Sequence, residues 1–255
     1  MVRKIWLLNV IACAMVCTGL QAVTPSVNDS ANLEFQKKFL KRQVSQTMSV
    51  GRAIRSIASH YPQDIVSVVD VALDTYPDRY QEIIHAAIST QPAATEEIVQ
   101  LAIKKNVSSC PSIVKLAINA EPTYVDFVVQ AAANATPEEL DEIVRVAVLT
   151  EPDSADSIVQ TLSIEHPNKI IEIMTTALNT VPYVGEYVVE ALLAVFPMRK
   201  DEVVKTAINN TRDQREQQIR ILSAAQNAGV DENMIREYAS GAGISNEDIN
   251  LALAD

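Results

Sequence analysis

Prolines recur at a fixed interval through most of this 255-residue chain. Between residues 62 and 211 every step is 15 residues, except for one step of 30 in which Val107 takes the missing place. The prolines of this series are Pro62, Pro77, Pro92, Pro122, Pro137, Pro152, Pro167, Pro182 and Pro197. A constant spacing marks tandem structural units. Residues 62–211 are therefore predicted to form ten units of 15 residues.

Apolar residues keep the same register within each unit. When the proline is counted as position 1, position 7 is Ile or Val in all ten units, position 8 is Val in eight and position 11 is Ala in eight. Position 9 is always polar. These spacings give one apolar stripe on a helix, and proline suits the first helical turn. Each unit is predicted to be one helix of about 12 residues with a turn of about three.

The short turns determine how the helices are arranged. Helices joined by such turns must be antiparallel neighbours. One long coiled coil with a 15-residue period is excluded, because each interior proline would cost about 3 kcal/mol. We therefore predict an all-α protein, an α-solenoid of tandem single-helix units stacked as antiparallel pairs with helical caps at both ends. It resembles tetratricopeptide and HEAT-type solenoids only in this stacking, since their periods of about 34 and about 40 residues differ.

The first 22 residues are typical of a secretory signal peptide. Two basic residues precede the apolar stretch Ile5–Leu20, and Leu20-Gln21-Ala22 is a candidate cleavage site. A retained membrane anchor and a lipoprotein box at Val10–Cys13 are the alternatives. We expect an exported protein, periplasmic or extracellular. Cleavage would leave Cys110 as the one cysteine, so the mature chain would have no internal disulfide.

The remaining segments are assigned to a linker and two caps. Residues 23–31 are polar and expected to be disordered, and residues 32–61 are expected to form basic N-terminal capping helices. Within them, residues 47–61 keep the repeat register without its proline. Residues 212–255 are expected to form a C-terminal cap that ends in two small helices.

Cations are concentrated at the N-terminal end of an acidic chain. The net charge is −11 for the whole chain, yet residues 23–61 have a net charge of +4. The candidate partner-binding cations are Lys37, Lys38, Lys41, Arg42, Arg52 and Arg55. One interpretation is a docking collar for an anionic surface, such as a membrane or an acidic polymer. The alternative is a capping helix whose charges lie over the acidic first repeats.

Two units depart from the pattern. In the unit 107–121 the proline moves to Pro111, so we expect a later helix start and a longer loop. This loop would form a bend or a binding notch, or it is sequence drift without consequence. Gly185 marks a second soft point, near Tyr183, Tyr187 and Phe196. If Tyr183 and Tyr187 are exposed to solvent, they are candidate contact residues. The alternative is that these aromatic rings belong to the core.

No pattern of catalytic or ligand-binding residues is found. The three histidines lack metal-ligand spacing, and no phosphate loop or nucleophile elbow is present. We therefore predict no catalytic, cofactor-binding or metal-binding residue and no enzyme activity, and the acidic repeats argue against nucleic acid.

The leading hypothesis is an exported binding or scaffold protein that holds a protein, peptide or polymer partner on its solenoid surface. One alternative is a self-assembling structural component of the cell envelope, in which the basic end meets acidic repeats of the next chain. The other is a hydrolase that uses carboxylates in the solenoid groove.

Overall fold

The computed structural model describes the backbone of residues 27–254 and the side chains of residues 33–254. The predicted signal peptide and residues 23–26 lie outside this part. The described chain contains no β-strand, and the predicted all-α solenoid is confirmed. The α-helices are α1 Val27–Thr47, α2 Val50–His60, α3 Ile65–Thr75, α4 Tyr80–Thr90, α5 Thr95–Lys104, α6 Cys110–Ala120, α7 Val125–Ala135, α8 Leu140–Thr150, α9 Ala155–Glu165, α10 Ile170–Thr180, α11 Gly185–Val195, α12 Lys200–Asn210, α13 Arg215–Asn227, α14 Glu232–Gly241 and α15 Asn246–Ala252.

Outside the unit 92–106, whose helix α5 has 10 residues, each regular unit consists of a 3-10 turn followed by an 11-residue α-helix. The turn takes positions 1–3 and begins with the proline, whose missing N–H would have no partner in a first turn. The α-helix takes positions 4–14. The 3-10 turns are Pro62–Asp64, Pro77–Arg79, Pro92–Ala94, Pro122–Tyr124, Pro137–Glu139, Pro152–Ser154, Pro167–Lys169, Pro182–Val184 and Pro197–Arg199.

Position 15 links one helix to the next without leaving backbone groups unpaired. The N–H of Tyr76 donates to the carbonyl of Ala72 at 2.8 Å, and the carbonyl of Tyr76 accepts from the N–H of Arg79 at 2.9 Å. The residue before a proline is disfavoured in the helical region, and Tyr76 has φ −136° and ψ 59°. The chain therefore leaves one helix and begins the next within a single residue.

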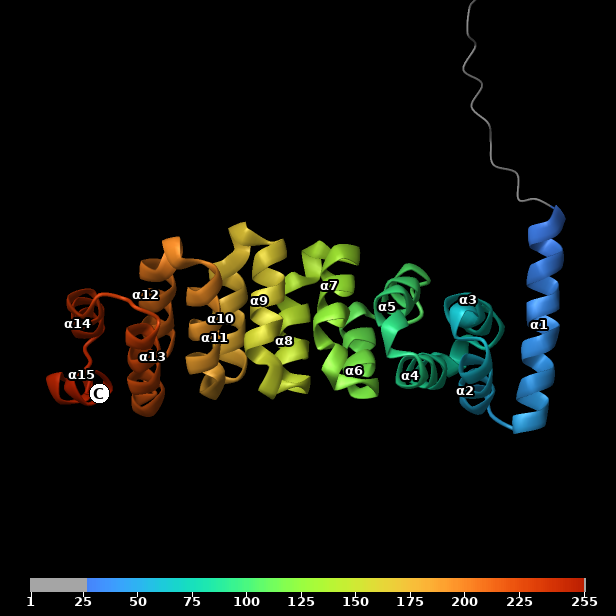
Figure 1. Cartoon of the computed structure of the whole chain (residues 1–255), viewed down its shortest axis with the longest axis horizontal. Helices are drawn as coiled ribbons and strands as arrows, with labels where there is room; N and C mark the ends of the chain where they lie inside the picture. Colours follow the sequence, from blue (N-terminus) through green and yellow to red (C-terminus); the bar gives the residue numbers. More distant parts are fainter. Residues whose placement is uncertain (1–26, 255) are drawn as a thin grey trace, which may run out of the picture.

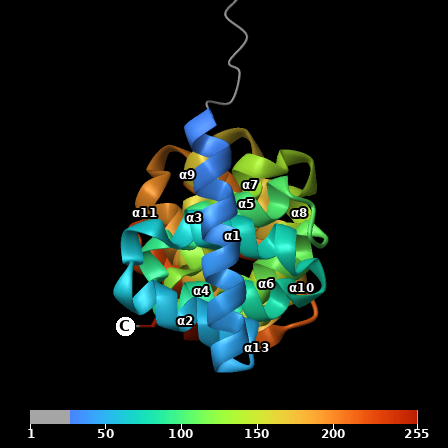
Figure 2. The same ribbon diagram turned by 90° about the vertical axis from the view of Figure 1, so that its right-hand side faces the viewer.

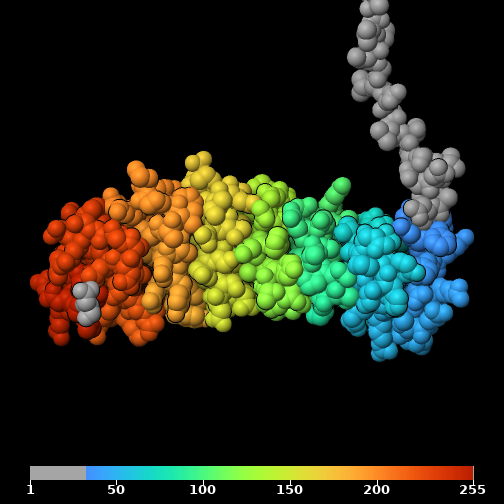
Figure 3. All heavy atoms as spheres, viewed as in Figure 1, coloured from blue at the N-terminus to red at the C-terminus, as the bar shows by residue number. Residues whose placement is uncertain are grey.

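The helices form two layers along an elongated rod (Figure 1). Most helices between α4 and α11 pack more extensively against the helix two positions away in the chain than against the next helix, so odd-numbered and even-numbered helices form separate rows. Seen from one end, the rows surround a common interior, and α1 crosses the end of the stack (Figure 2). Side chains fill the spaces between successive helices (Figure 3).

The repeat register explains the core. Positions 7, 8 and 11 are buried in every one of the ten units, whereas position 9 is never buried. Position 4 is also buried, except at Tyr80 and Lys200. Because position 11 is usually Ala, neighbouring helices can approach closely there.

Polar side chains connect units that are two apart. Ser157 Oγ donates to Asp126 at 2.6 Å, and Asn210 Nδ2 donates to Thr175 Oγ1 at 3.2 Å. The Thr176 hydroxyl donates to Asp141 in the same way. These bonds fix the stacking of each layer at the solvent edge.

Both ends differ in detail from the predicted boundaries. Helix α1 begins at Val27, and so includes residues 27–31 of the stretch that we expected to be disordered. No proline or glycine occurs between Pro25 and Gly51 to interrupt it. Helix α2 covers positions 4–14 of the unit 47–61. Helix α13 begins at position 4 of a further unit counted from residue 212, and packs on α11.

The irregular unit keeps its register. Helix α6 begins at Cys110, which is position 4 as for the other α-helices, but the 3-10 turn of positions 1–3 is missing, so helical structure starts three residues later than in a regular unit, as expected. Pro111 is the second residue of α6, where a missing N–H is harmless. The loop is longer because α5 ends at Lys104 and no 3-10 turn follows; Asn106 has a left-handed φ of 51°.

Gly185 is not a soft point. It is a buried residue that begins the regular helix α11. In the described part of the chain, no helix is both long enough and apolar enough to cross a membrane.

Candidate functional site

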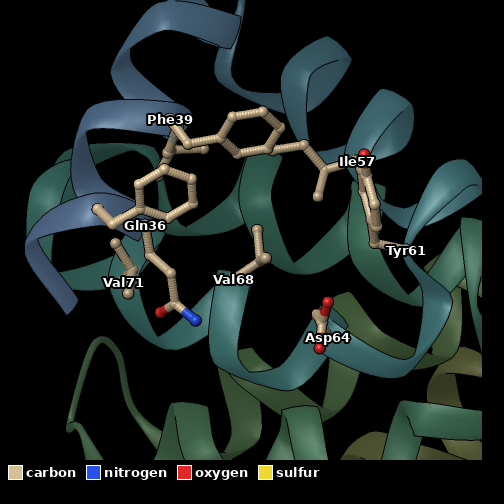
Figure 4. A pocket seen from close by; sticks show the side chains of 9 residues that line it. Gln36, Phe39, Ile57, Tyr61, Asp64, Val68 and Val71 are labelled. Atoms are coloured by element: carbon tan, nitrogen blue, oxygen red, sulfur yellow. The ribbon is translucent and has the colours of Figure 1, made fainter. Parts of the chain in front are cut away.

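An apolar depression lies at the N-terminal end of the rod, between α1 and the pair α2–α3 (Figure 4). We call it the end groove. Its volume is about 350 Å³, and it is lined by Phe35, Gln36, Phe39, Leu40, Ile57, Tyr61, Asp64, Val68 and Val71.

The repeat determines the floor of the end groove. Val68 and Val71 point into it from α3, and Ile57 comes from α2 (Figure 4). In the body of the solenoid such residues are covered by the next helix of the layer. Here α1 takes that place as a single helix that crosses the end of the stack (Figure 2), and Ile57, Val68 and Val71 are buried beneath it.

Aromatic rings form the sides of the end groove. Phe39 and Tyr61 meet edge to face, with ring centroids 6.4 Å apart. Phe35 is 68% exposed and Tyr61 is 49% exposed. Exposed aromatic rings beside an apolar hollow are typical of a protein contact surface.

Three cations of α1 share its outer face. Lys38, Lys41 and Arg42 are exposed and are spaced at i, i+3 and i+4; we call them the basic face. Lys38 follows the exposed ring of Phe35 by one turn, and Lys37 is half-buried. None of the four forms an ion pair with a carboxylate of residues 33–254. The alternative in which these charges lie over acidic repeats therefore finds no support among the described side chains.

Arg52 and Arg55 lie on α2 and are not part of the basic face of α1. Arg52 lies at the turn between α1 and α2, where its guanidinium donates to the Thr47 carbonyl at 3.4 Å. Arg55 is near Glu82 of α4, where its charge helps to lower the pKa of that carboxyl group. The six predicted cations thus do not form a single patch.

Tyr183 and Tyr187 line a second depression on the side of the rod. They are 58% and 54% exposed. With Asp153 and Asp156 they line a hollow of about 280 Å³ between the starts of α9 and α11. We call it the lateral notch. Phe196 is not part of it, because this ring is half-buried against the core.

The irregular unit forms a third, polar hollow of about 590 Å³. The Nζ atom of Lys105 lies 2.6 Å from both Asp70 Oδ1 and Asp74 Oδ1. Burial alone would lower the pKa of Lys105, but the two carboxylates outweigh it and raise this pKa. Lys105, the one cation among the described residues that line this hollow, is therefore already held by two carboxylates.

The shifted ionisable groups do not resemble an acid–base site. Hydrogen bonds lower the pKa of Glu82, Asp141 and Asp248, the opposite of what a general acid needs. Burial raises the pKa of the Cys110 thiol, which disfavours the reactive thiolate. Within the described residues, no group of three or more His, Cys, Asp or Glu side chains could hold a metal ion.

Sequence reasoning identified the cations and the two tyrosines but not the end groove. One side of the groove could have been predicted, because a spacing of four residues puts the rings of Phe35 and Phe39 on one face of α1. The other side of the groove comes from α2 and α3, and only the stacking reveals it. Comparison with protein-family models, curated proteins and solved structures gives no match to this chain.

Proposed function

We propose that this chain is an exported, non-enzymatic binding or scaffold protein, whose end groove holds an apolar and acidic segment of a protein or peptide partner. The observation that carries the proposal is that α1 lines a hollow of about 350 Å³ and also presents, on its outer face, three exposed cations that lack ion pairs in the described chain. An apolar side chain would enter the hollow, and carboxylates next to it would meet Lys38, Lys41 and Arg42.

A crosslinked pull-down from the native compartment, read by mass spectrometry, tests the proposal. The collar variant reverses the basic face with Lys38→Glu, Lys41→Glu and Arg42→Glu. The matched control makes the same charge change at three other exposed cations, with Lys104→Glu, Lys115→Glu and Arg212→Glu. We expect one dominant partner that the wild type and the control recover and the collar variant loses.

Recovery of that partner by the collar variant would contradict the proposal. A second outcome would also contradict the proposal: no partner is recovered, and the wild type sediments with vesicles rich in anionic lipid. The basic face would then be a membrane contact. Circular dichroism of all three proteins must first show equal helix content.

A scaffold needs a second contact surface, and the lateral notch suits one of opposite charge. Tyrosine rings beside Asp153 and Asp156 favour a Lys or Arg side chain of a partner through cation–π and charge attraction. We expect Tyr183→Ala with Tyr187→Ala to lose a partner that the collar variant retains. An unchanged set of recovered proteins would remove the lateral notch from the proposal.

Export has its own test. The predicted cleavage after Ala22 gives a mature chain that begins at Val23. Intact-mass measurement of the protein from the periplasmic or extracellular fraction should show this N-terminus. A full-length chain that remains inside the cell would contradict export.

A further inference from the structure

The two ends of the rod have opposite charge. Helix α1 stands at one end, and α14 and α15 stand at the other (Figure 1). Among residues 33–61 there are six Lys and Arg residues and one carboxylate residue, Glu34; among residues 231–254 there are five Asp and Glu residues and one Arg. A surface of one sign at each end favours end-to-end contact between copies.

Three carboxylates at the C-terminal end have no ion pair within the described chain, and one of them, Asp231, is used as the N-cap of α14. Arg236 pairs with Glu232, and Arg215 pairs with Asp248. Glu237 of α14 and Glu247 of α15 are both exposed and take part in no such pair. They are available to cations from outside the chain.

An exposed apolar side chain lies next to one of these carboxylates. Leu251 is 58% exposed and follows Glu247 by four residues, so both lie on the solvent face of α15. This face presents an apolar side chain with a carboxylate one turn away, which is complementary to the apolar end groove and the basic face of α1.

We infer that the occupant of the end groove is the C-terminal cap of a second copy of this chain. Leu251 of the second copy enters the hollow beside Phe39 and Tyr61. Glu247 and Glu237 meet the basic face of α1. The inference rests on the proposed function of the end groove and names its partner.

The geometry of the rod determines the kind of assembly. The two surfaces differ from each other and lie at opposite ends, so the contact is heterologous. Such a contact leaves a free surface at each end of every pair and builds an open filament rather than a closed dimer. Salt should weaken it, because the Debye length falls from about 8 Å at physiological ionic strength to about 3 Å at 1 M salt, which screens the attraction between exposed charges.

Sedimentation velocity of the purified full chain, over a range of concentration and salt, tests the inference by exchanging the charges. We expect the average mass of the wild type to rise at least twofold with concentration at low salt and to return to that of a monomer at high salt. The collar variant should remain monomeric, and so should the tail variant, Glu237→Lys with Glu247→Lys. A chain with both sets of changes should assemble again, because its two ends are again of opposite charge.

A further variant tests the apolar contact. Leu251→Ala should weaken self-association about 10-fold, because the buried area of one leucine is lost. The matched control of the pull-down, with Lys104→Glu, Lys115→Glu and Arg212→Glu, should assemble like the wild type.

A wild type that stays monomeric at every concentration and salt would overturn the inference, and so would failure of the doubly reversed chain to assemble. The pull-down separates the two proposals. A wild type that stays monomeric, together with a different protein that only the collar variant loses, would leave the proposed function standing and reject self-association. A monomeric wild type, together with a pull-down in which no protein depends on the basic face, would reject both self-association and the proposed function.

Discussion

A single carboxylate of the repeat supports the N-terminal end of the stack. Glu82 Oε1 accepts a hydrogen bond from the N–H of Gly51 at 2.9 Å, and the Ser49 hydroxyl donates to the same atom. Gly51 is required for this approach, because a Cβ atom there would lie 2.8 Å from Glu82 Cγ. Glu82 thus satisfies the start of α2 from two units away, which links the local cap to the layer.

Removing this carboxylate should destabilise the fold. Glu82→Ala should cost about 1 kcal/mol in the free energy of unfolding at neutral pH, as for other lost helix caps. Glu97 has the same position in its unit, is exposed and makes no such contact, so Glu97→Ala is the matched control. Urea unfolding followed by circular dichroism measures both.

The pH dependence follows from the lowered pKa of Glu82. A carboxyl group with a lower pKa in the folded state stabilises the fold fully above its unfolded pKa, and this stabilisation is lost as the pH falls through the folded pKa. The difference between Glu82→Ala and wild type should therefore be largest near neutral pH and should shrink in acid. A difference that does not depend on pH would contradict the charged cap.

At the scale of one element, the helix of each unit was largely predictable. Periodic prolines and the stripe at positions 7, 8 and 11 predicted the helices, because both features act within a single unit. Burial of position 4 was not predictable, since Thr95, Cys110 and Gly185 share no hydropathy there. What they share is contact with a helix of another unit, which sequence spacing does not contain.

Gly185 shows how such a contact constrains a residue. A Cβ atom at this position would lie 3.1 Å from Ile221 Cδ1 and 3.3 Å from Leu178 Cδ2. We expect Gly185→Val to destabilise the protein by about 1–3 kcal/mol through overpacking. Gly241→Val is the control, because no atom lies within 4 Å of its Cβ position. Thermal unfolding that gives equal losses for both variants would contradict the close packing of α11 and α13.

For the whole molecule, the sequence predicted a solenoid with a basic end but not where a partner would lie. The end groove arises because the repeating layers stop and α1 crosses them as a single helix. The lateral notch arises because the start of α11 lies beside the start of α9, 30 residues earlier in the chain. Both hollows therefore depend on how units stack, whereas the cations and tyrosines around them could be named from their residue types.

The central claim is that a partner binds at the N-terminal end of the rod. Hydrogen–deuterium exchange of the whole chain, with and without the partner recovered in the pull-down, tests it most directly. We expect slower exchange in residues 33–47 of α1 and in residues 61–71 when the partner is present, with no such change in the collar variant. Protection confined to the lateral notch or spread over the flanks of the repeats, with α1 unchanged, would contradict it.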